Sequence, residues 1–86
     1  MLKVIYAEKF ISQFESLDSK TKKLALKKID IFKTNPRHPS LATHKLNGIL
    51  STYFSFLINY QIRIVFEYGE KDTVHFLKIG DYIVYR

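Results

Sequence analysis

The sequence predicts an α+β domain in which an N-terminal strand and then a two-helix hairpin precede a twisted antiparallel sheet, with the hairpin packed on one face of that sheet. Residues 7–33 place apolar side chains at helical spacing. Residues 46–86 contain three runs rich in β-branched and aromatic residues and a short fourth run, separated by turn signals. Helices and strands segregated along a chain are typical of α+β folds. A chain of 86 residues has room for one core, so we expect one domain over residues 1–86.

The first strand and the first helix are predicted by their periodicity. Residues 2–6 alternate in a way that suits a half-buried strand. Residues 7–17 then follow a helical period, and one stripe of this short helix carries Phe10, Phe14 and Leu17. The stripe is apolar and the remaining positions are mostly polar, so the helix should pack on the sheet through this stripe.

A second helix is predicted over residues 20–33. Either Asp18 or Ser19 can cap its start, because a side-chain oxygen there accepts a bond from the free amides of the first turn. The helix ends at Asn35-Pro36, since proline disfavours helical geometry in the residue before it. The two helices should therefore form a hairpin.

The sheet begins after a loop over residues 36–43, with Asn47-Gly48 as the turn that leads into it. Strands are predicted over residues 52–58, 62–68 and 73–79, followed by a short end strand over 82–85. In the middle strand, alternation places Ile62, Ile64, Phe66 and Tyr68 on the face that meets the helices. The other, more open face receives Arg63, Val65 and Glu67.

The charge of the chain is positive and unevenly placed. The net charge is +6, and residues 18–37 contribute +5 of it, from seven Lys or Arg residues against two Asp. Such a field, to which Lys27 and Lys28 belong, favours RNA or another polyanion, or an acidic protein partner. A lysine-rich helix that is merely solvated fits any single lysine about as well.

Several classes of protein are disfavoured by what the chain lacks. It has no cysteine, which fits a reducing compartment. It has no apolar run long enough for a signal peptide or a membrane span, so we expect a cytoplasmic protein without a membrane partner. His38, His44 and His75 lack metal-ligand spacing, and no phosphate-binding glycine loop or nucleophile elbow is present. We therefore expect neither a metal nor any other cofactor.

The open face of the sheet is the candidate site. The cationic, imidazole and phenolic groups that can converge on it are His44, Lys45, Arg63, Lys78, Tyr82, Tyr85 and Arg86. Such a set suits an RNA phosphodiester, because cleavage through the 2′-hydroxyl needs a proton acceptor, a cation for the phosphorane and a proton donor. Aromatic side chains can also stack on an unpaired base.

Each of these residues also has a purely structural interpretation. Arg63 can form an ion pair with Glu67 or Asp81, and His44 can make a loop hydrogen bond. Tyr82 and Tyr85 can be ordinary core or edge aromatics. Composition and spacing therefore lead only to a basic α+β domain whose partner is nucleic acid or an acidic protein.

Three segments resemble the RelE/ParE toxin superfamily, in particular its RelE/StbE and YafQ-like branch. They are HKLNG, YFSFLINYQIRIVFEY and DTVHFLKIGDYIVYR, and their order and spacing are similar to those of the family. The resemblance implies the toxin of a type II toxin–antitoxin system with metal-independent mRNA endoribonuclease activity on translating ribosomes. It also implies a cognate antitoxin, expected to be acidic and encoded next to the toxin.

The resemblance assigns roles by position. Arg63 corresponds to the sheet arginine that contacts the scissile phosphate, and His44 to the histidine before the K-L-x-G turn. Tyr82 stands where many members have a histidine, and Tyr85 lies near their terminal aromatic residue. Lys45, Lys78, Arg86, Lys27 and Lys28 are the expected RNA-binding cations.

The chain departs from the family pattern at two places. Phe54 and Phe56 occupy strand positions where classical RelE proteins have catalytic lysines, and Tyr82 replaces the usual histidine. A phenol, with a pKa of about 10, is a poor base at neutral pH. Two alternatives therefore stand beside the nuclease: a ParE-type inhibitor of DNA gyrase, and a weakened toxin that mainly binds its antitoxin.

Overall fold

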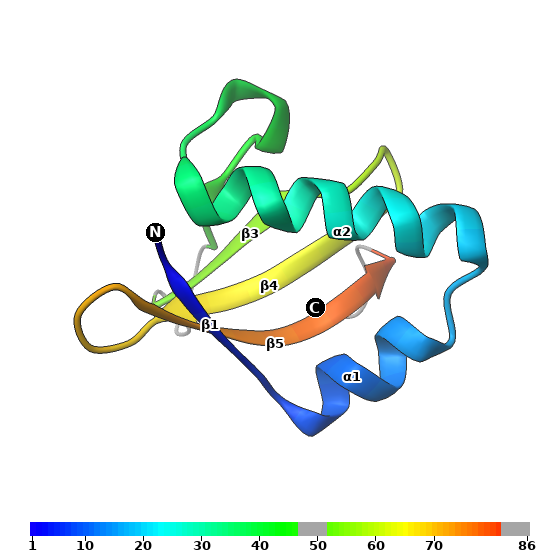
Figure 1. Ribbon diagram of the computed structural model, residues 1–86, viewed down its shortest axis with the longest axis horizontal. Coiled ribbons are helices and arrows are strands. Elements are labelled where there is room, and N and C mark those ends of the chain that lie inside the picture. The colour runs from blue at the N-terminus through cyan, green and yellow to red at the C-terminus, as the bar shows by residue number, and fades with distance from the viewer. Residues whose placement is uncertain (47–51, 82–86) are drawn as a thin grey trace.

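The computed structural model describes residues 1–46 and 52–81, and in that part it contains two α-helices and a five-stranded sheet (Figure 1). The elements, in chain order, are β1 (Lys3–Tyr6), α1 (Glu8–Glu15), α2 (Ser19–Thr34), the 3-10 turn η1 (Pro39–Leu41), β2 (His44–Lys45), β3 (Tyr53–Leu57), β4 (Ile62–Tyr68) and β5 (Thr73–Asp81). The predicted α+β class is confirmed. The predicted turn at Asn47-Gly48 and the end strand over residues 82–85 lie outside the described residues.

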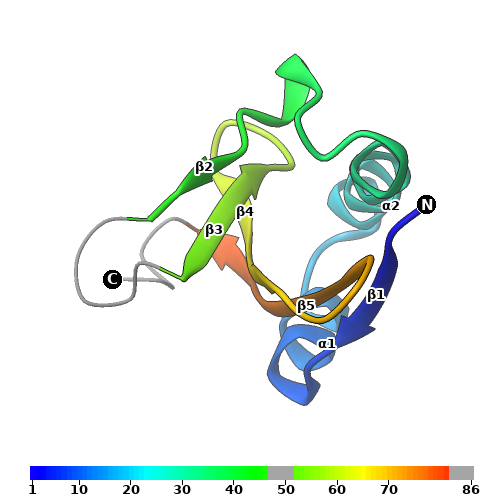
Figure 2. The same cartoon turned by 90° about the vertical axis from the view of Figure 1, so that its left-hand side faces the viewer.

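The sheet has the strand order β1-β5-β4-β3-β2 and is mixed rather than wholly antiparallel (Figure 2). β2, β3, β4 and β5 pair antiparallel, whereas β1 lies parallel to β5 at one edge, with Tyr6 opposite Phe76. Side-chain alternation predicts that residues 2–6 form a strand, but it carries no information about pairing direction. The long connection between β1 and β5 allows the parallel arrangement.

Both helices pack on one face of the sheet and bury an aromatic core. Phe10 of α1 and Phe32 of α2 are 3% and 0% exposed, and both contact Phe76 of β5. Phe32 also stacks on Phe56 of β3, with ring centroids 4.6 Å apart and planes 12° apart. The stripe predicted for the first helix is therefore the face that packs.

α2 begins where the sequence predicts. Asp18 is its N-cap, and the carboxylate accepts a 2.7 Å hydrogen bond from the amide of Thr21. This backbone hydrogen bond, together with the Thr21 side chain, lowers the pKa of Asp18 below its ordinary value. α1 lacks a side-chain cap, but Gln13 ties it to the sheet through a 3.0 Å bond from the amide of Ile79.

A β-bulge in β5 decides which of its residues reach the open face. Val65 pairs with Lys78 and Phe66 pairs with Phe76, so Leu77 is the extra residue. Without the bulge, strict alternation would put Lys78 on the same face as Phe76. With it, Ile79 enters the core and Lys78 lies on the opposite face.

None of the helices in the described part of the chain is long and apolar enough to cross a membrane.

Candidate functional site

The open face is the side of the sheet turned away from α1 and α2. Two rows of paired residues cross it, because directly opposed residues in antiparallel strands project to the same side. The first row is His44, Ser55, Val65 and Lys78, and the second is Leu57, Arg63 and Gly80. The register thus brings three of the predicted site residues, His44, Arg63 and Lys78, onto one surface from three different strands.

Arg63 lies near the middle of this surface and is half-buried. Its Nε atom is buried and has no hydrogen-bond partner. Within the described residues it forms no ion pair with Glu67 or Asp81, the two partners that a structural role would use. A buried, unpaired donor costs free energy, and no residue in the described ranges 1–46 and 52–81 offsets that cost for the Nε of Arg63.

Ser55 is a residue of the open face that the sequence analysis missed. It is 0% exposed, and its Oγ atom is buried without a hydrogen-bond partner. It lies between His44 and Val65 in the first row and alternates with the core-facing Phe54 and Phe56. That alternation is the signal that could have identified it, since a serine between two strand phenylalanines must face away from the core.

His44 is exposed and begins β2, at the edge of the sheet. The predicted loop hydrogen bond is present, because its Nδ1 lies 3.1 Å from the carbonyl oxygen of Ala42. Its second ring nitrogen makes no hydrogen bond within the described part of the chain. Two strand spacings separate β2 from β4, which places His44 about 10 Å to the side of Arg63.

The predicted RNA-binding lysines do not all share this surface. Lys78 lies on it, paired with Val65. Lys45 alternates with His44 and pairs with Phe54, so it leaves β2 on the other side and is exposed at the edge. Lys27 and Lys28 belong to α2, which packs on the opposite face of the sheet.

Tyr82, Tyr85 and Arg86, also predicted for the site, lie outside the described residues.

Within residues 1–46 and 52–81, no group of three or more His, Cys, Asp or Glu side chains is placed to hold a metal ion. His38 is occupied locally, because its Nδ1 accepts a 3.1 Å hydrogen bond from the amide of Ser40.

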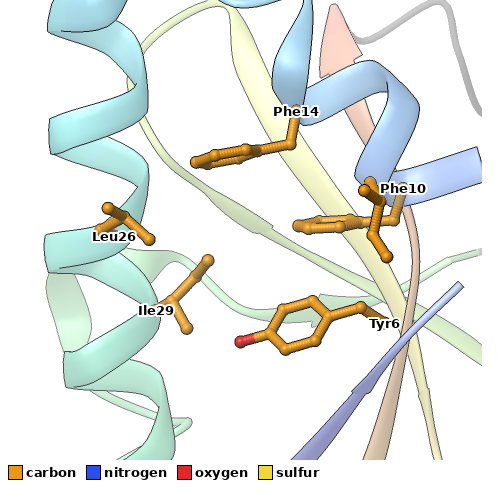
Figure 3. A pocket seen from close by; sticks show the side chains of 6 residues that line it. Tyr6, Phe10, Phe14, Leu26 and Ile29 are labelled. Atoms are coloured by element: carbon orange, nitrogen blue, oxygen red, sulfur yellow. The ribbon is translucent and has the colours of Figure 1, made fainter. Parts of the chain in front are cut away.

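An apolar groove lies between β1, α1 and α2, away from the open face (Figure 3). It has a volume of about 210 Å³, and the residues lining it are Tyr6, Phe10, Ile11, Phe14, Leu26 and Ile29. Leu26 is 54% exposed and Ile11 45% exposed, so the rim presents large apolar side chains to solvent.

The charges around the groove differ between its two walls. On α2, Lys22 and Lys33 continue the stripe of Leu26 and Ile29 at helical spacing, one at each end. On α1, Glu8 and Glu15 lie three and four residues from Ile11. The α2 wall is therefore basic and the α1 wall acidic.

Comparison with known proteins gives no match to any family model and none to a curated protein sequence. Solved structures do match. A YoeB/ParE toxin from Agrobacterium tumefaciens superposes with a TM-score of 0.79 at 15% identity, covering 93% of this chain and 98% of that one. YafQ from E. coli strain BL21(DE3) gives 0.73 at 15% identity, covering 99% and 98%.

The archaeal RelE of a RelE–RelB complex from Pyrococcus horikoshii OT3 gives a TM-score of 0.74 at 18% identity, covering 93% of each chain. At identities this low, the superpositions establish a common fold and nothing more. The fold of this chain is therefore that of the RelE/ParE toxins, as the three sequence segments predict.

Proposed function

We propose that this chain is the toxin of a type II toxin–antitoxin pair and that it cleaves mRNA, without a metal ion, on translating ribosomes. The observation that carries the proposal is the unpaired, half-buried Arg63 in the middle of the open face. A guanidinium can make the bidentate contact that phosphate favours.

The proposed reaction uses the 2′-hydroxyl next to the scissile phosphate. His44 removes the hydroxyl proton while the O2′–P bond forms, and Arg63 stabilises the negative charge of the phosphorane. The P–O5′ bond then breaks, and the leaving oxygen takes a proton from the phenol of Tyr82 or Tyr85 or from water.

The remaining cations act on the RNA backbone. Lys78, Lys45 and Arg86 contact phosphates near the site, and Lys27 and Lys28 on α2 contribute to the long-range field that speeds encounter with the ribosome. Such contacts position the RNA and carry little sequence information.

Expression of matched variants tests the nuclease proposal. The wild type is expected to arrest growth and to produce mRNA cuts that primer extension detects, whereas Arg63→Ala does neither. Arg37→Ala is the control, because it removes the same charge from the exposed loop before η1. Full arrest by a soluble Arg63→Ala protein contradicts the proposal.

Gyrase inhibition is the second candidate, favoured by the aromatic residues of β3. Phe56 is 0% exposed, and Phe54 stacks on Phe66 at 5.5 Å. Neither position can therefore supply a cation of the kind that classical RelE proteins use there. An SOS response with intact mRNA selects this candidate, and harmless expression of a soluble protein selects a weakened toxin that only binds its antitoxin.

The proposed antitoxin is acidic, and the apolar groove is its docking surface. The groove is smaller than the pockets of about 300–1,000 Å³ that hold small molecules, but it suits a few apolar anchors of an amphipathic helix. Lys22 and Lys33 would face acidic side chains of that helix. The RelE structure from Pyrococcus horikoshii OT3 is itself a complex with RelB.

Calorimetry with the product of a neighbouring reading frame tests this surface. Leu26→Glu places a charge in the groove and is expected to weaken binding at least about tenfold, which corresponds to about 1.4 kcal/mol. Tyr60→Glu makes the same kind of change at a 91% exposed residue in the turn between β3 and β4, and is expected to leave the affinity unchanged. Equal affinities for the two variants rule out docking in the groove.

A further inference from the structure

His38 and His44 make opposite kinds of hydrogen bond through the same ring atom, Nδ1. The Nδ1 of His44 lies 3.1 Å from the carbonyl oxygen of Ala42. A carbonyl oxygen only accepts, so the hydrogen belongs to Nδ1. In the neutral imidazole the lone pair then lies on Nε2.

His38 has the reverse arrangement. Its Nδ1 lies 3.1 Å from the backbone nitrogen of Ser40, and an amide N–H only donates. The lone pair of neutral His38 is therefore on Nδ1 and its hydrogen on Nε2. The Oγ of Ser40, 2.9 Å away, lies beside the same nitrogen. His38 thus uses its basic nitrogen to cap η1 and has none left for a substrate.

The backbone at Ala42 creates the bond to His44. Ala42 has φ 47° and ψ 45°, the left-handed conformation, which is sterically unfavourable for an alanine. The surrounding loop enforces it. Leu41 is 0% exposed in the core, the Ala42 amide donates to the Pro39 carbonyl, and the Thr43 hydroxyl donates to the Pro36 carbonyl at 2.6 Å.

We infer that Ala42 is a positioning residue, whose left-handed backbone holds His44 in the tautomer that offers an unprotonated Nε2 as proton acceptor. This inference adds a positioning residue to the proposed nuclease site, and it rests on that proposed function for the role of His44 as proton acceptor. Strained backbone maintained beside a candidate site is a common feature of functional loops. The arrangement also distinguishes His44 from His38, because of these two only His44 has a basic nitrogen that no backbone group uses.

The same bond assists the proton transfer. When the 2′-hydroxyl gives its proton to Nε2, the ring becomes an imidazolium and the Nδ1–H bond to the Ala42 carbonyl becomes charge-assisted. The O2′–P bond forms as the P–O5′ bond breaks, and O5′ takes its proton from water or a phenol. The Ala42 carbonyl therefore stabilises the charged ring without touching the RNA.

Imidazole ¹⁵N spectra of the free protein test the tautomers directly. The chain has three histidines, and single substitutions with glutamine assign their signals. When both rings are neutral, we expect His44 to carry its hydrogen on Nδ1 and His38 to carry it on Nε2, so that each ring is the control for the other. A His44 ring with its hydrogen on Nε2 overturns the inference.

Two variants separate positioning from folding. Ala42→Gly keeps the left-handed conformation, and we expect it to preserve the His44 tautomer and the cleavage rate. Ala42→Val disfavours that conformation, and we expect it to shift the tautomer and to lower kcat/KM about tenfold or more, within the range that base catalysis contributes. A folded Ala42→Val protein with an unchanged tautomer contradicts the inference.

Failure of the proposed function gives a different result. The predicted tautomers in a protein that cuts no RNA would refute the nuclease and leave the loop geometry intact. Efficient cleavage with the opposite tautomer would refute the positioning role alone.

Discussion

Arg63 of β4 lies directly opposite Gly80 of β5, and on its other side it faces Leu57 of β3. Neither neighbour can pair with a guanidinium, because glycine has no side chain and leucine has no polar atom. The sheet register therefore gives Arg63 no side-chain partner at the two directly opposed positions. This accounts for the absence of a hydrogen bond from its buried Nε to either neighbouring strand, and the proposed phosphate contact of Arg63 depends on it.

Replacement of Arg63 by methionine should separate function from stability. Methionine keeps an apolar stem and removes the unpaired Nε, so we expect the free energy of unfolding to stay constant or to rise by about 1 kcal/mol. The rate of RNA cleavage should fall about 100-fold or more, because a charge that stabilises the transition state is lost. Urea unfolding and a cleavage assay on a model mRNA measure the two effects.

Arg37→Met is the matched control, since Arg37 is exposed in the loop before η1. It should change neither quantity by more than experimental error. A loss of more than about 1 kcal/mol in Arg63→Met would instead indicate that Arg63 holds the fold together, as a structural ion pair would.

The sequence predicts the middle of this fold better than its edges. Alternation correctly places Ile64 and Phe66 in the core and Arg63 on the opposite face, because a strand with one side packed on helices must keep its register. The short strand β2 carries too few residues for a periodic signal. It exists because His44 and Lys45 pair with β3, which is a tertiary effect.

The candidate site is predicted in part for the same reason. Arg63 stands out as a cation within an apolar run. The alternation of Ser55 with Phe54 and Phe56 indicates which face it occupies, but the sequence does not show that its hydroxyl is buried without a partner. Lys78 reaches the open face only through the bulge at Leu77, which strict alternation does not anticipate.

Phe32 should be the most sensitive position of the aromatic core. It is 0% exposed and packs against Phe56, Phe66 and Phe76. Phe32→Ala leaves a cavity and is expected to cost about 3–5 kcal/mol, a large share of the roughly 5–15 kcal/mol that stabilises a domain. Leu26→Ala on the exposed side of the same helix should cost well under 1 kcal/mol. Comparable losses of unfolding free energy for the two variants, measured by urea unfolding, would show that Phe32 is not central to the core.

Gly69 and His75 should be energetically coupled. A Cβ atom on Gly69 would lie 2.7 Å from Nε2 and 2.9 Å from Cδ2 of His75, so Gly69→Ala forces the imidazole to move. We expect this substitution to cost about 1–2 kcal/mol in the wild type and almost nothing in a His75→Ala background. A double-mutant cycle of unfolding free energies measures the coupling, and additive effects would show that the cost of Gly69→Ala does not come from His75.

Substitution by glycine should change the stability differently at the two non-glycine residues with positive φ in the described part of the chain. They are Ala42, with φ 47°, and Asp72, with φ 43°. Alanine is disfavoured in the left-handed region, whereas aspartate tolerates it. Ala42→Gly should therefore raise the free energy of unfolding by up to about 1 kcal/mol, and Asp72→Gly should change it less. Thermal unfolding of both variants gives the comparison, and a larger gain at Asp72 would contradict it.

The cap of α2 should make part of the stability depend on pH. The hydrogen bond from the Thr21 amide lowers the pKa of Asp18 in the folded chain, so the folded state favours the ionised carboxylate. A carboxyl group whose pKa is lower in the folded state than in the unfolded state stabilises the folded state. This stabilisation is complete above the unfolded pKa, about 3.9 for aspartate, and is lost as pH falls through the folded pKa.

Asp18→Ala should therefore lower Tm at neutral pH, and its difference from the wild type should shrink as pH falls below about 4. Asp18→Asn keeps a neutral cap, so its difference from Asp18→Ala should hardly vary with pH. Because the other carboxyl groups are common to all three proteins, their titration cancels in these differences. A wild-type advantage over Asp18→Ala that persists undiminished at low pH would show that the carboxylate charge plays no part in the cap.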